Sequence, residues 1–234
     1  MGLELKQVRV TKGAFSLNAD FRLASGSLTS VIGPSGAGKS TLFDALAGFV
    51  QPDNGTVAFD GETLNDLDPG KRPIAILFQD NNLFPHLSVG QNIGLALSYK
   101  RRLTGAQAAL VEQVLGRVGL DGMAERRLAQ LSGGQLSRVA LARMLLLDRP
   151  LWLLDEPFAG VDPISVNDIK SIIRHLKDRG IGVLITDHNV RETLDICDTA
   201  YIVSTGHIIA DGDADTILGN QQVRDVYLGA DFRL

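Results

Sequence analysis

One segment constrains this chain more than any other: the run GPSGAGKS at positions 33–40. It fits the pattern G-x-x-x-x-G-K-[S/T] in full and stands between a strand-like run, 27–32, and a helix-like run, Lys39–Ala47. Its glycines let backbone N–H groups face an anion, and the start of the helix adds about half a positive charge. We therefore predict a phosphate-binding loop in which Lys39 neutralises the β- and γ-phosphates and Ser40 coordinates Mg²⁺. The alternative is a glycine-rich turn with a surface lysine. The residues assigned to the loop are Gly33, Pro34, Ser35, Gly36, Ala37, Gly38, Lys39, Ser40 and Thr41.

Short β-rich segments alternate with amphipathic helical segments along the chain. The alternation predicts an α/β fold with a parallel sheet and a helical insertion, in one domain over residues 1–234. The continuously apolar run 151–154 is typical of a parallel strand covered on both faces. Further strands are predicted at 56–59, 74–78 and 182–186, and a hairpin at 201–203 and 208–210. Helices are predicted within 87–147, with breaks at 100–104 and 119–132, then at 164–177, at 190–196 and near Thr216 and Val223.

Other features of the sequence exclude several classes of protein. No apolar run approaches the roughly 18 to 20 residues that span a bilayer, and residues 1–20 lack the pattern of a signal peptide. The formal net charge of −4 argues against nucleic acid as a partner. The single cysteine, Cys197, excludes a disulfide framework and fits the reducing cytosol. We expect a cytoplasmic protein.

Two adjacent carboxylates, Asp155 and Glu156, directly follow the apolar run 151–154. In open α/β sheets ligands bind beyond the carboxyl ends of the strands, where the phosphate loop also lies. Asp155 is therefore predicted to contact Mg²⁺, and Glu156 to act as the base that polarises an attacking water. The alternative is an acidic turn that caps the next segment.

A second glycine cluster, LSGGQ at 131–135, precedes a helix-like run that reaches about Leu147. A hydroxyl and two glycines at a helix N-terminus can form another anion site, although the same pattern alone is an ordinary N-cap. The residues assigned to this site are Ser132, Gly133, Gly134 and Gln135.

In their order along the chain, these motifs resemble those of the ATP-binding subunit of ABC transporters. The phosphate loop, Gln79 after a strand, LSGGQ, the acidic strand, Asp162 and His188 all appear as they do in that family. The resemblance implies a P-loop NTPase core of the RecA-like type, an antiparallel β subdomain and an inserted helical subdomain at about 87–149. It also implies an ATP hydrolase that uses Mg²⁺ and works with transmembrane subunits at the cytoplasmic face of the inner membrane.

The resemblance further implies that two copies pair head to tail, with each ATP between the phosphate loop of one copy and the LSGGQ of the other. Ser132 and Gly134 would then touch the γ-phosphate bound by the partner. His188 would hold that phosphate from the phosphate-loop side, and Gln79 would sense Mg²⁺ and the attacking water. Asp162 would help the two copies communicate.

The sequence departs from the family pattern in two places. Residues 11–14 lack the usual aromatic that stacks on adenine, so Phe15 is the nearest candidate for that role. After LSGGQ the chain continues with Leu136-Ser137-Arg138 in place of the usual basic and glutamine residues.

The resemblance also changes along the chain. Residues 1 to about 155 are similar to the ATPase of thiamine importers, and residues from about 158 to 234 to the ATPase of the lipopolysaccharide exporter. This suggests a chimera joined near the acidic strand; a natural importer ATPase with an unusual C-terminal half is the alternative. The family's membrane-contacting groove follows Gln79 and is importer-like here, so thiamine import is the first expectation. The alternatives are lipopolysaccharide export, a soluble ABC-type ATPase and an engineered nucleotide-binding scaffold that couples to nothing.

Overall fold

The elements of the fold follow the predicted alternation closely. The structure is a computed structural model that describes residues 2–99 and 102–228. The strands are β1 Gly2–Lys12, β2 Phe15–Ala24, β3 Leu28–Ile32, β4 Asn54–Phe59, β5 Glu62–Thr63, β6 Ile74–Leu77, β7 Leu151–Asp155, β8 Gly182–Thr186, β9 Thr199–Ser204 and β10 His207–Gly212. The helices are α1 Lys39–Ala47, α2 Val89–Gly94, α3 Gly105–Arg117, α4 Gly133–Leu145, α5 Pro163–Asp178, α6 Val190–Leu194, α7 Ala214–Gly219 and α8 Gln221–Val223. Short 3₁₀ turns lie at Pro69–Lys71 and Leu128–Gln130, and a π turn at Arg224–Leu228.

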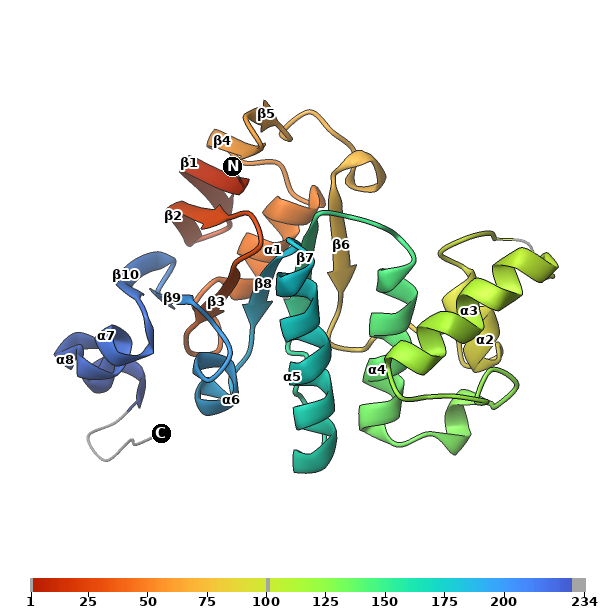
Figure 1. Ribbon diagram of the computed structural model, residues 1–234. Helices are drawn as coiled ribbons and strands as arrows, with labels where there is room; N and C mark the ends of the chain where they lie inside the picture. The colour runs from red at the N-terminus through yellow and green to blue at the C-terminus, as the bar shows by residue number, and fades with distance from the viewer. Residues whose placement is uncertain (1, 100–101, 229–234) are drawn as a thin grey trace.

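The described strands form one mixed sheet in the order β5-β4-β1-β2-β10-β9-β3-β8-β7-β6. The strands β9, β3, β8, β7 and β6 run parallel to their neighbours in that series. All of β3 and β8 is buried, as expected for strands covered on both faces. The carboxyl ends of β3, β6, β7 and β8 lie at one edge of the sheet (Figure 1). The prediction of a parallel α/β core is confirmed.

The other half of the sheet is antiparallel and is built from β1, β2, β4 and β5. The resemblance implied such a subdomain, but the residue pattern predicted neither β2 nor β1, and β1 is irregular. Its buried residues change from odd to even positions: Leu3 and Leu5 are followed by Val8 and Val10. The register shifts between Leu5 and Val8, and Gln7 there has a φ of 49°. This bulge breaks the period-two signal that marks a strand.

The β9–β10 hairpin supports the phosphate loop directly. Thr205 and Gly206 both have positive φ, 45° and 81°, as two-residue turns between twisted strands require. A Cβ on Gly206 would lie 2.0 Å from the carbonyl oxygen of Ser16, so only glycine fits. The Gly206 N–H donates to the carbonyl oxygen of Ala37, 2.9 Å away, and thereby ties the hairpin to the loop.

The helices α2, α3 and α4 extend from one side of the sheet, beyond β6 (Figure 1). Their buried side chains, among them Ile93, Val114 and Leu141, share one core with Trp152 and Leu154 of β7. The predicted break at 100–104 begins with Lys100 and Arg101, which lie outside the described residues. In the stretches 2–99 and 102–228, no helix combines the length and the apolar character that crossing a membrane requires.

Candidate functional site

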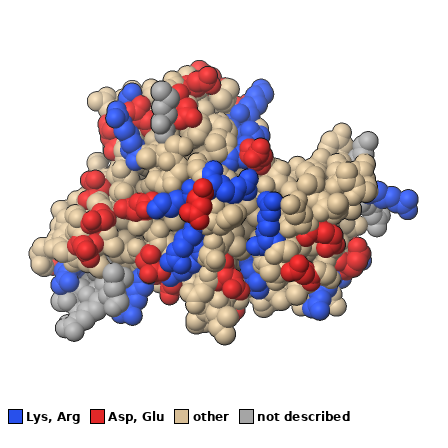
Figure 2. All heavy atoms as spheres, in the orientation of Figure 1, with Lys and Arg blue, Asp and Glu red and all other residues tan. Residues whose placement is uncertain are grey.

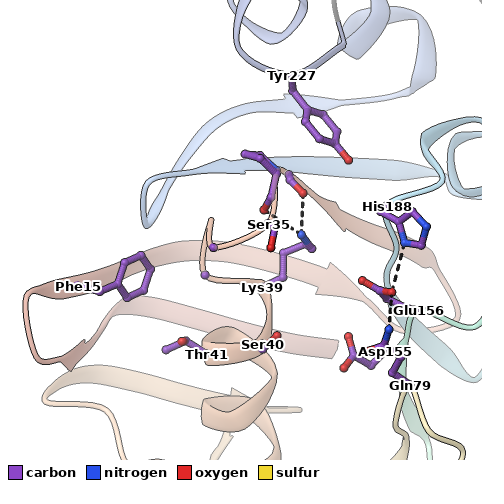
Figure 3. Close-up of a pocket in the computed structure, with 14 residues that line it drawn as sticks. Phe15, Ser35, Lys39, Ser40, Thr41, Gln79, Asp155, Glu156, His188 and Tyr227 are labelled. Carbon is purple, nitrogen blue, oxygen red and sulfur yellow. Dashed lines mark hydrogen bonds and ion pairs between the residues drawn. The ribbon is translucent and has the colours of Figure 1, made fainter. Parts of the chain in front are cut away.

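The loops at the carboxyl edge of the sheet enclose a cavity of about 600 Å³ (Figure 3). It brings together the predicted phosphate loop, the acidic pair, Gln79 and His188 from four separate segments of the chain. Tyr227 is a lining residue that the sequence did not predict. The lining residues are Phe15, Gly33, Pro34, Ser35, Gly36, Gly38, Lys39, Ser40, Thr41, Gln79, Asp155, Glu156, His188 and Tyr227.

The glycines of the phosphate loop serve its backbone path. Gly36 and Gly38 have φ values of 78° and 114°, which side chains rarely tolerate. A Cβ on Gly33 would lie 2.1 Å from the carbonyl oxygen of Val203, and one on Gly38 would lie 2.9 Å from Cζ of Phe15. No side chain caps the start of α1. The first turn of α1 therefore faces the cavity with backbone donors, which suits an anion.

Lys39 carries the positive charge of the cavity. Its ammonium group donates to the carbonyl oxygens of Gly33 at 2.6 Å and Pro34 at 3.1 Å, so the loop folds around it. Burial lowers the pKa of Lys39, while the carboxylates of Glu156 and Asp155 oppose that shift. The side chain is thus a partly desolvated cation beside two anions.

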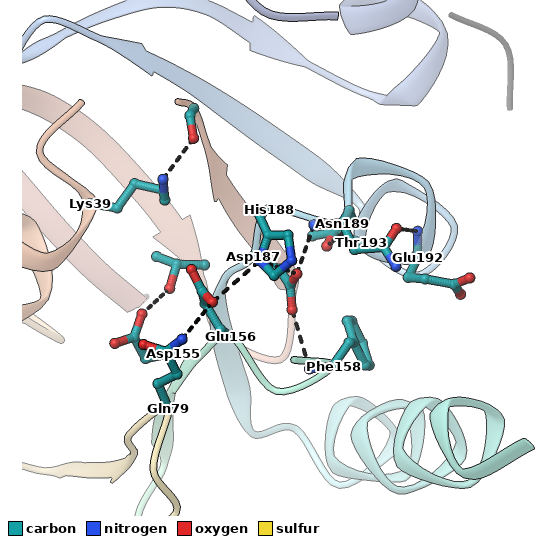
Figure 4. Close-up of polar contacts among 12 residues, drawn as sticks. Lys39, Gln79, Asp155, Glu156, Phe158, Asp187, His188, Asn189, Glu192 and Thr193 are labelled. Atoms are coloured by element: carbon teal, nitrogen blue, oxygen red, sulfur yellow. Dashed lines mark hydrogen bonds and ion pairs between the residues drawn. The ribbon is translucent and has the colours of Figure 1, made fainter. Parts of the chain in front are cut away.

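Glu156 is the centre of a small polar network (Figure 4). Its φ of 49° is left-handed, and its N–H donates to the carbonyl oxygen of Thr186 at 2.7 Å. Such backbone strain is uncommon outside glycine and gathers at functional sites. The Gln79 amide donates to Oε2 of Glu156 at 3.0 Å, and Nδ1 of His188 lies 3.2 Å from the same oxygen. One carboxylate oxygen therefore meets both an amide and an imidazole.

Asp155, the last residue of β7, is half-buried. The Thr186 hydroxyl donates to its Oδ1 at 2.5 Å. Burial raises the pKa of Asp155, and the hydrogen bond from Thr186 partly opposes that rise. The hydroxyl of Ser40 and the free amide oxygen of Gln79 line the same cavity.

These oxygen donors fit a magnesium ion held mostly by water and phosphate. Mg²⁺ prefers oxygen ligands and commonly takes only one or two from protein. Within the described part of the chain, no group of three or more His, Cys, Asp or Glu side chains could hold a metal ion. A site made from Ser40, Gln79 and Asp155 would need the phosphates of a bound nucleotide to complete it.

Asp187 is a buried carboxylate that joins the loop after β7 to the loop after β8. Its oxygens accept the N–H groups of Phe158 at 3.2 Å and Asn189 at 2.7 Å (Figure 4). Burial raises its pKa. Asp187 thereby fixes the segment after Glu156 against the segment that bears His188. The sequence signal for this role is its position between the end of β8 and a histidine.

The LSGGQ residues lie outside the cavity. Ser132 caps α4: its hydroxyl accepts the Gln135 N–H at 3.3 Å, while the Gln135 side chain accepts the Ser132 N–H at 3.0 Å. Gly134 is buried against α5, where a Cβ would lie 2.2 Å from Cβ of Ser165. A Cβ on Gly133 would lie 3.0 Å from the carbonyl oxygen of Gly160. A single chain therefore does not bring LSGGQ to its own phosphate loop.

Ala37 and Asp162, two further predicted residues, also lie outside the cavity lining. Ala37 is buried, and its N–H donates to the carbonyl oxygen of Pro34 at 3.1 Å. Asp162 caps α5 by accepting the Ser165 N–H at 3.0 Å, and this hydrogen bond lowers the pKa of Asp162. Ala37 thus shapes the loop from inside, while Asp162 starts the helix that covers Gly134.

Comparison with known proteins gives a consistent result. Residues 17–159 match the family described as ABC transporter, and residues 207–233 match the branched-chain amino acid ATP-binding cassette transporter family. The chain is 40% identical to the thiamine import ATP-binding protein ThiQ of Jannaschia sp., covering 94% of this chain and 97% of that one. It is 44% identical to the lipopolysaccharide export ATP-binding protein LptB of Escherichia coli K12, covering 90% and 89%.

Solved structures share the fold. A nucleotide-free ATP-binding cassette of an ABC transporter superposes with a TM-score of 0.89 at 26% identity, covering 97% of this chain and 99% of that one. A dimeric cassette in a post-hydrolysis state, bound to ADP and Pi, superposes with a TM-score of 0.78 at 27% identity, covering 90% and 98%. The predicted mixed α/β cassette fold is confirmed.

The thiamine and lipopolysaccharide relatives each align with about nine tenths of the chain. The two alignments therefore overlap over most of its length. They give no support to the expected junction between an importer half and an exporter half.

Proposed function

The chain belongs to the ABC transporter family as an ATP-binding, ATP-hydrolysing subunit, and from this premise we propose that it hydrolyses Mg-ATP in sites shared between two copies. One observation carries the proposal. The cavity unites Lys39, Asp155 and Glu156, whereas Ser132 and Gly134 of the same chain lie outside it. A second copy is the natural source of the missing contacts.

Nucleotide binding is assigned to the phosphate loop. The first-turn N–H groups of α1 and the Lys39 ammonium would receive the β- and γ-phosphates in place of the loop carbonyls. Ser40, Asp155 and Gln79 would hold Mg²⁺, which when bound neutralises charge on the phosphate oxygens. Phe15, packed at Gly38 on the cavity wall, is proposed to stack on adenine.

Hydrolysis is assigned to Glu156. Its carboxylate would accept a proton from the attacking water, while the amide of Gln79 and the imidazole of His188 fix its position through Oε2. His188 is exposed on the cavity wall and would then donate to the γ-phosphate. Asp187 holds the loop of His188 in place through its two backbone contacts.

The second copy would supply LSGGQ in a head-to-tail arrangement. The Ser132 hydroxyl accepts from Gln135, which leaves its own O–H free to donate to the γ-phosphate bound by the partner. The α4 N-terminus would add a favourable dipole. Asp162, at the start of the helix that packs on Gly134, would help the two copies communicate.

Size-exclusion chromatography of Glu156→Gln tests the shared site. This substitution keeps the nucleotide contacts and removes the base, so the variant should elute as a dimer with Mg-ATP and as a monomer with Mg-ADP or without nucleotide. A variant that stays monomeric with Mg-ATP while binding it would contradict the proposal.

Transport requires a membrane partner, which we propose docks beside the segment that follows Gln79. A second cavity of about 500 Å³ lies there, with apolar, aromatic and basic walls. It is lined by His86, Leu87, Gln91, Leu95, Tyr99, Leu103 and Arg127. Docking at this surface would hold the chain on the cytoplasmic face of the inner membrane. In this proposal residues 1–234 act as one ATPase domain, whose helical subdomain at about 87–149 bears the docking surface.

Thiamine is the first proposed transport substrate, because the residues after Gln79 resemble importer ATPases. Lipopolysaccharide is the second, supported by the LptB relatives. To distinguish these two substrates, the chain is mixed with the membrane subunits of each transporter type and its phosphate release is measured. Stimulation by the thiamine complex alone is expected; stimulation by the lipopolysaccharide complex alone would reverse the order, and stimulation by neither would contradict coupling to both.

A further inference from the structure

Tyr227 reaches the nucleotide cavity from the C-terminal part of the chain. It lies in the π turn Arg224–Leu228, almost two hundred residues after the phosphate loop, yet it lines the same cavity as Lys39. The turn is anchored by Arg224, whose Nε donates to the carbonyl oxygen of Leu218 at 2.7 Å. Figure 3 shows the phenol hydroxyl directed toward the space between Ser35 and His188.

The ring and the hydroxyl of Tyr227 have different surroundings. The ring packs against a small apolar cluster that includes Ile217 and Val223, so it has a structural role. The hydroxyl has no hydrogen-bond partner among residues 2–99 and 102–228. A half-buried phenol usually satisfies its O–H, and here the cavity is the open direction.

The phenol of Tyr227 is affected by the carboxylates of the proposed hydrolytic site. Burial raises the pKa of Tyr227, and the carboxylates of Asp187 and Glu156 add to the rise. These are the carboxylates of the hydrolytic network, whereas Phe15 lies on the opposite side of Lys39 in the view of Figure 3. The phenol therefore stays protonated at neutral pH, as a neutral donor that adds no negative charge beside a phosphate.

We propose that the Tyr227 hydroxyl donates a hydrogen bond to the terminal phosphate of a nucleoside triphosphate in this cavity and so favours ATP over ADP. The proposal rests on the function proposed above and adds a specificity-determining contact to it. The ring, held by the apolar cluster, brings the donor to a fixed position without ordering a long side chain.

The test measures the Kd of the non-hydrolysable analogue adenosine 5′-(β,γ-imido)triphosphate and of ADP, by calorimetry on the full chain with Mg²⁺. Tyr227→Phe keeps the ring and removes the donor. The matched control is Tyr201→Phe, because the Tyr201 hydroxyl donates to the carbonyl oxygen of Arg22 and lies outside this cavity. We expect Tyr227→Phe to weaken the triphosphate analogue about tenfold, to leave ADP within about twofold, and to leave Tm unchanged.

Three outcomes would overturn the inference. If Tyr227→Phe weakens the binding of both nucleotides equally, or lowers Tm as well as affinity, Tyr227 has a structural role only. Unchanged affinities in both Tyr227→Phe and Tyr227→Ala would remove it from the site. A wild-type chain that binds neither nucleotide would instead overturn the proposed function, and this inference with it.

Discussion

The phosphate loop and the LSGGQ segment are both glycine-rich turns that open a helix, yet their glycines serve different ends. In the phosphate loop, Gly36 and Gly38 adopt positive φ and no side chain caps α1. In LSGGQ, Gly134 is helical and buried against Ser165, and the capping box of Ser132 and Gln135 engages the N–H groups of these two residues. The phosphate loop lines the cavity, whereas Gly134 packs against α5 of its own chain.

Under the proposed function, this difference would leave one chain with half of a site. Lys39 and the acidic pair meet in one cavity because the parallel strands end together. Ser132 instead presents its hydroxyl outward from a helix that packs on α5. The following predictions test the two regions separately, starting with the largest expected effect.

Removing the base should have the largest effect on turnover. Glu156→Gln keeps the contacts to Gln79 and His188 but cannot accept the proton, so ATP turnover should fall by about 10² to 10⁴. A phosphate-release assay measures this, with Glu112→Gln on the exposed face of α3 as the matched control. Turnover within a few-fold of wild type would remove Glu156 from the role of base.

Removing the Lys39 ammonium should weaken the binding of Mg-ATP. Lys39→Ala deletes the ammonium from the phosphate loop, and Mg-ATP affinity should fall by about 10- to 100-fold because a charge-assisted contact is lost. Calorimetry measures the affinity, and Lys71→Ala, which removes a surface lysine paired with Asp68, is the control. Unchanged affinity would contradict the assignment of the loop.

Burying the Asp155 carboxylate beside the phosphate loop should lower the stability of the folded protein. Because burial raises its folded pKa above the ordinary 3.8, the folded state binds the proton more tightly than the unfolded state. Stability is therefore lost as pH rises from the unfolded pKa through the folded pKa, and stays lost above it. Asp155→Asn, which can still accept from Thr186, should raise the free energy of unfolding at pH 7.

Denaturation of the nucleotide-free protein by urea measures this gain. The difference between Asp155→Asn and wild type should shrink as pH falls toward 3.8. A variant that is less stable than wild type at pH 7 would mean that the Asp155 carboxylate stabilises the fold, and the predicted cost of burying it would be wrong.

The local pattern was enough to predict much of the fold. The helix Lys39–Ala47 and the strand Gly182–Thr186 have the predicted bounds, because a phosphate loop and a continuous apolar run are strong local signals. The strand β1 was missed because the bulge at Gln7 reverses its alternation. The two glycines of LSGGQ cannot be told apart in the sequence. The structure distinguishes them, because Gly134 is the one that packs against Ser165.

Parts of the site depend on contacts between distant segments. Tyr227 carries no motif of its own, and the sequence signal for Asp187 is only its position between the end of β8 and His188. Their roles come from the ending of β8 beside β7 and from the return of the C-terminal turn over the phosphate loop. Such contacts depend on tertiary structure, which the periodicity of a single segment does not encode.

The shared site can be tested by mixing two inactive variants. Lys39→Ala disables the phosphate half, and Ser132→Asp places a negative charge where the phosphate of the partner should arrive. Aspartate remains a good N-cap, so α4 should stay intact, and Ser132→Asn is the neutral control. A substitution at Gly134 would not serve, because any side chain there collides with Ser165.

The decisive measurement is ATP turnover by an equimolar mixture of Lys39→Ala and Ser132→Asp. Half of the randomly formed dimers would pair an intact phosphate loop with an intact LSGGQ at one of two sites. The mixture should therefore recover roughly a quarter of wild-type turnover, although each variant alone is inactive. A mixture as inactive as its components, or a Ser132→Asp protein with full turnover by itself, would contradict a site shared between two copies.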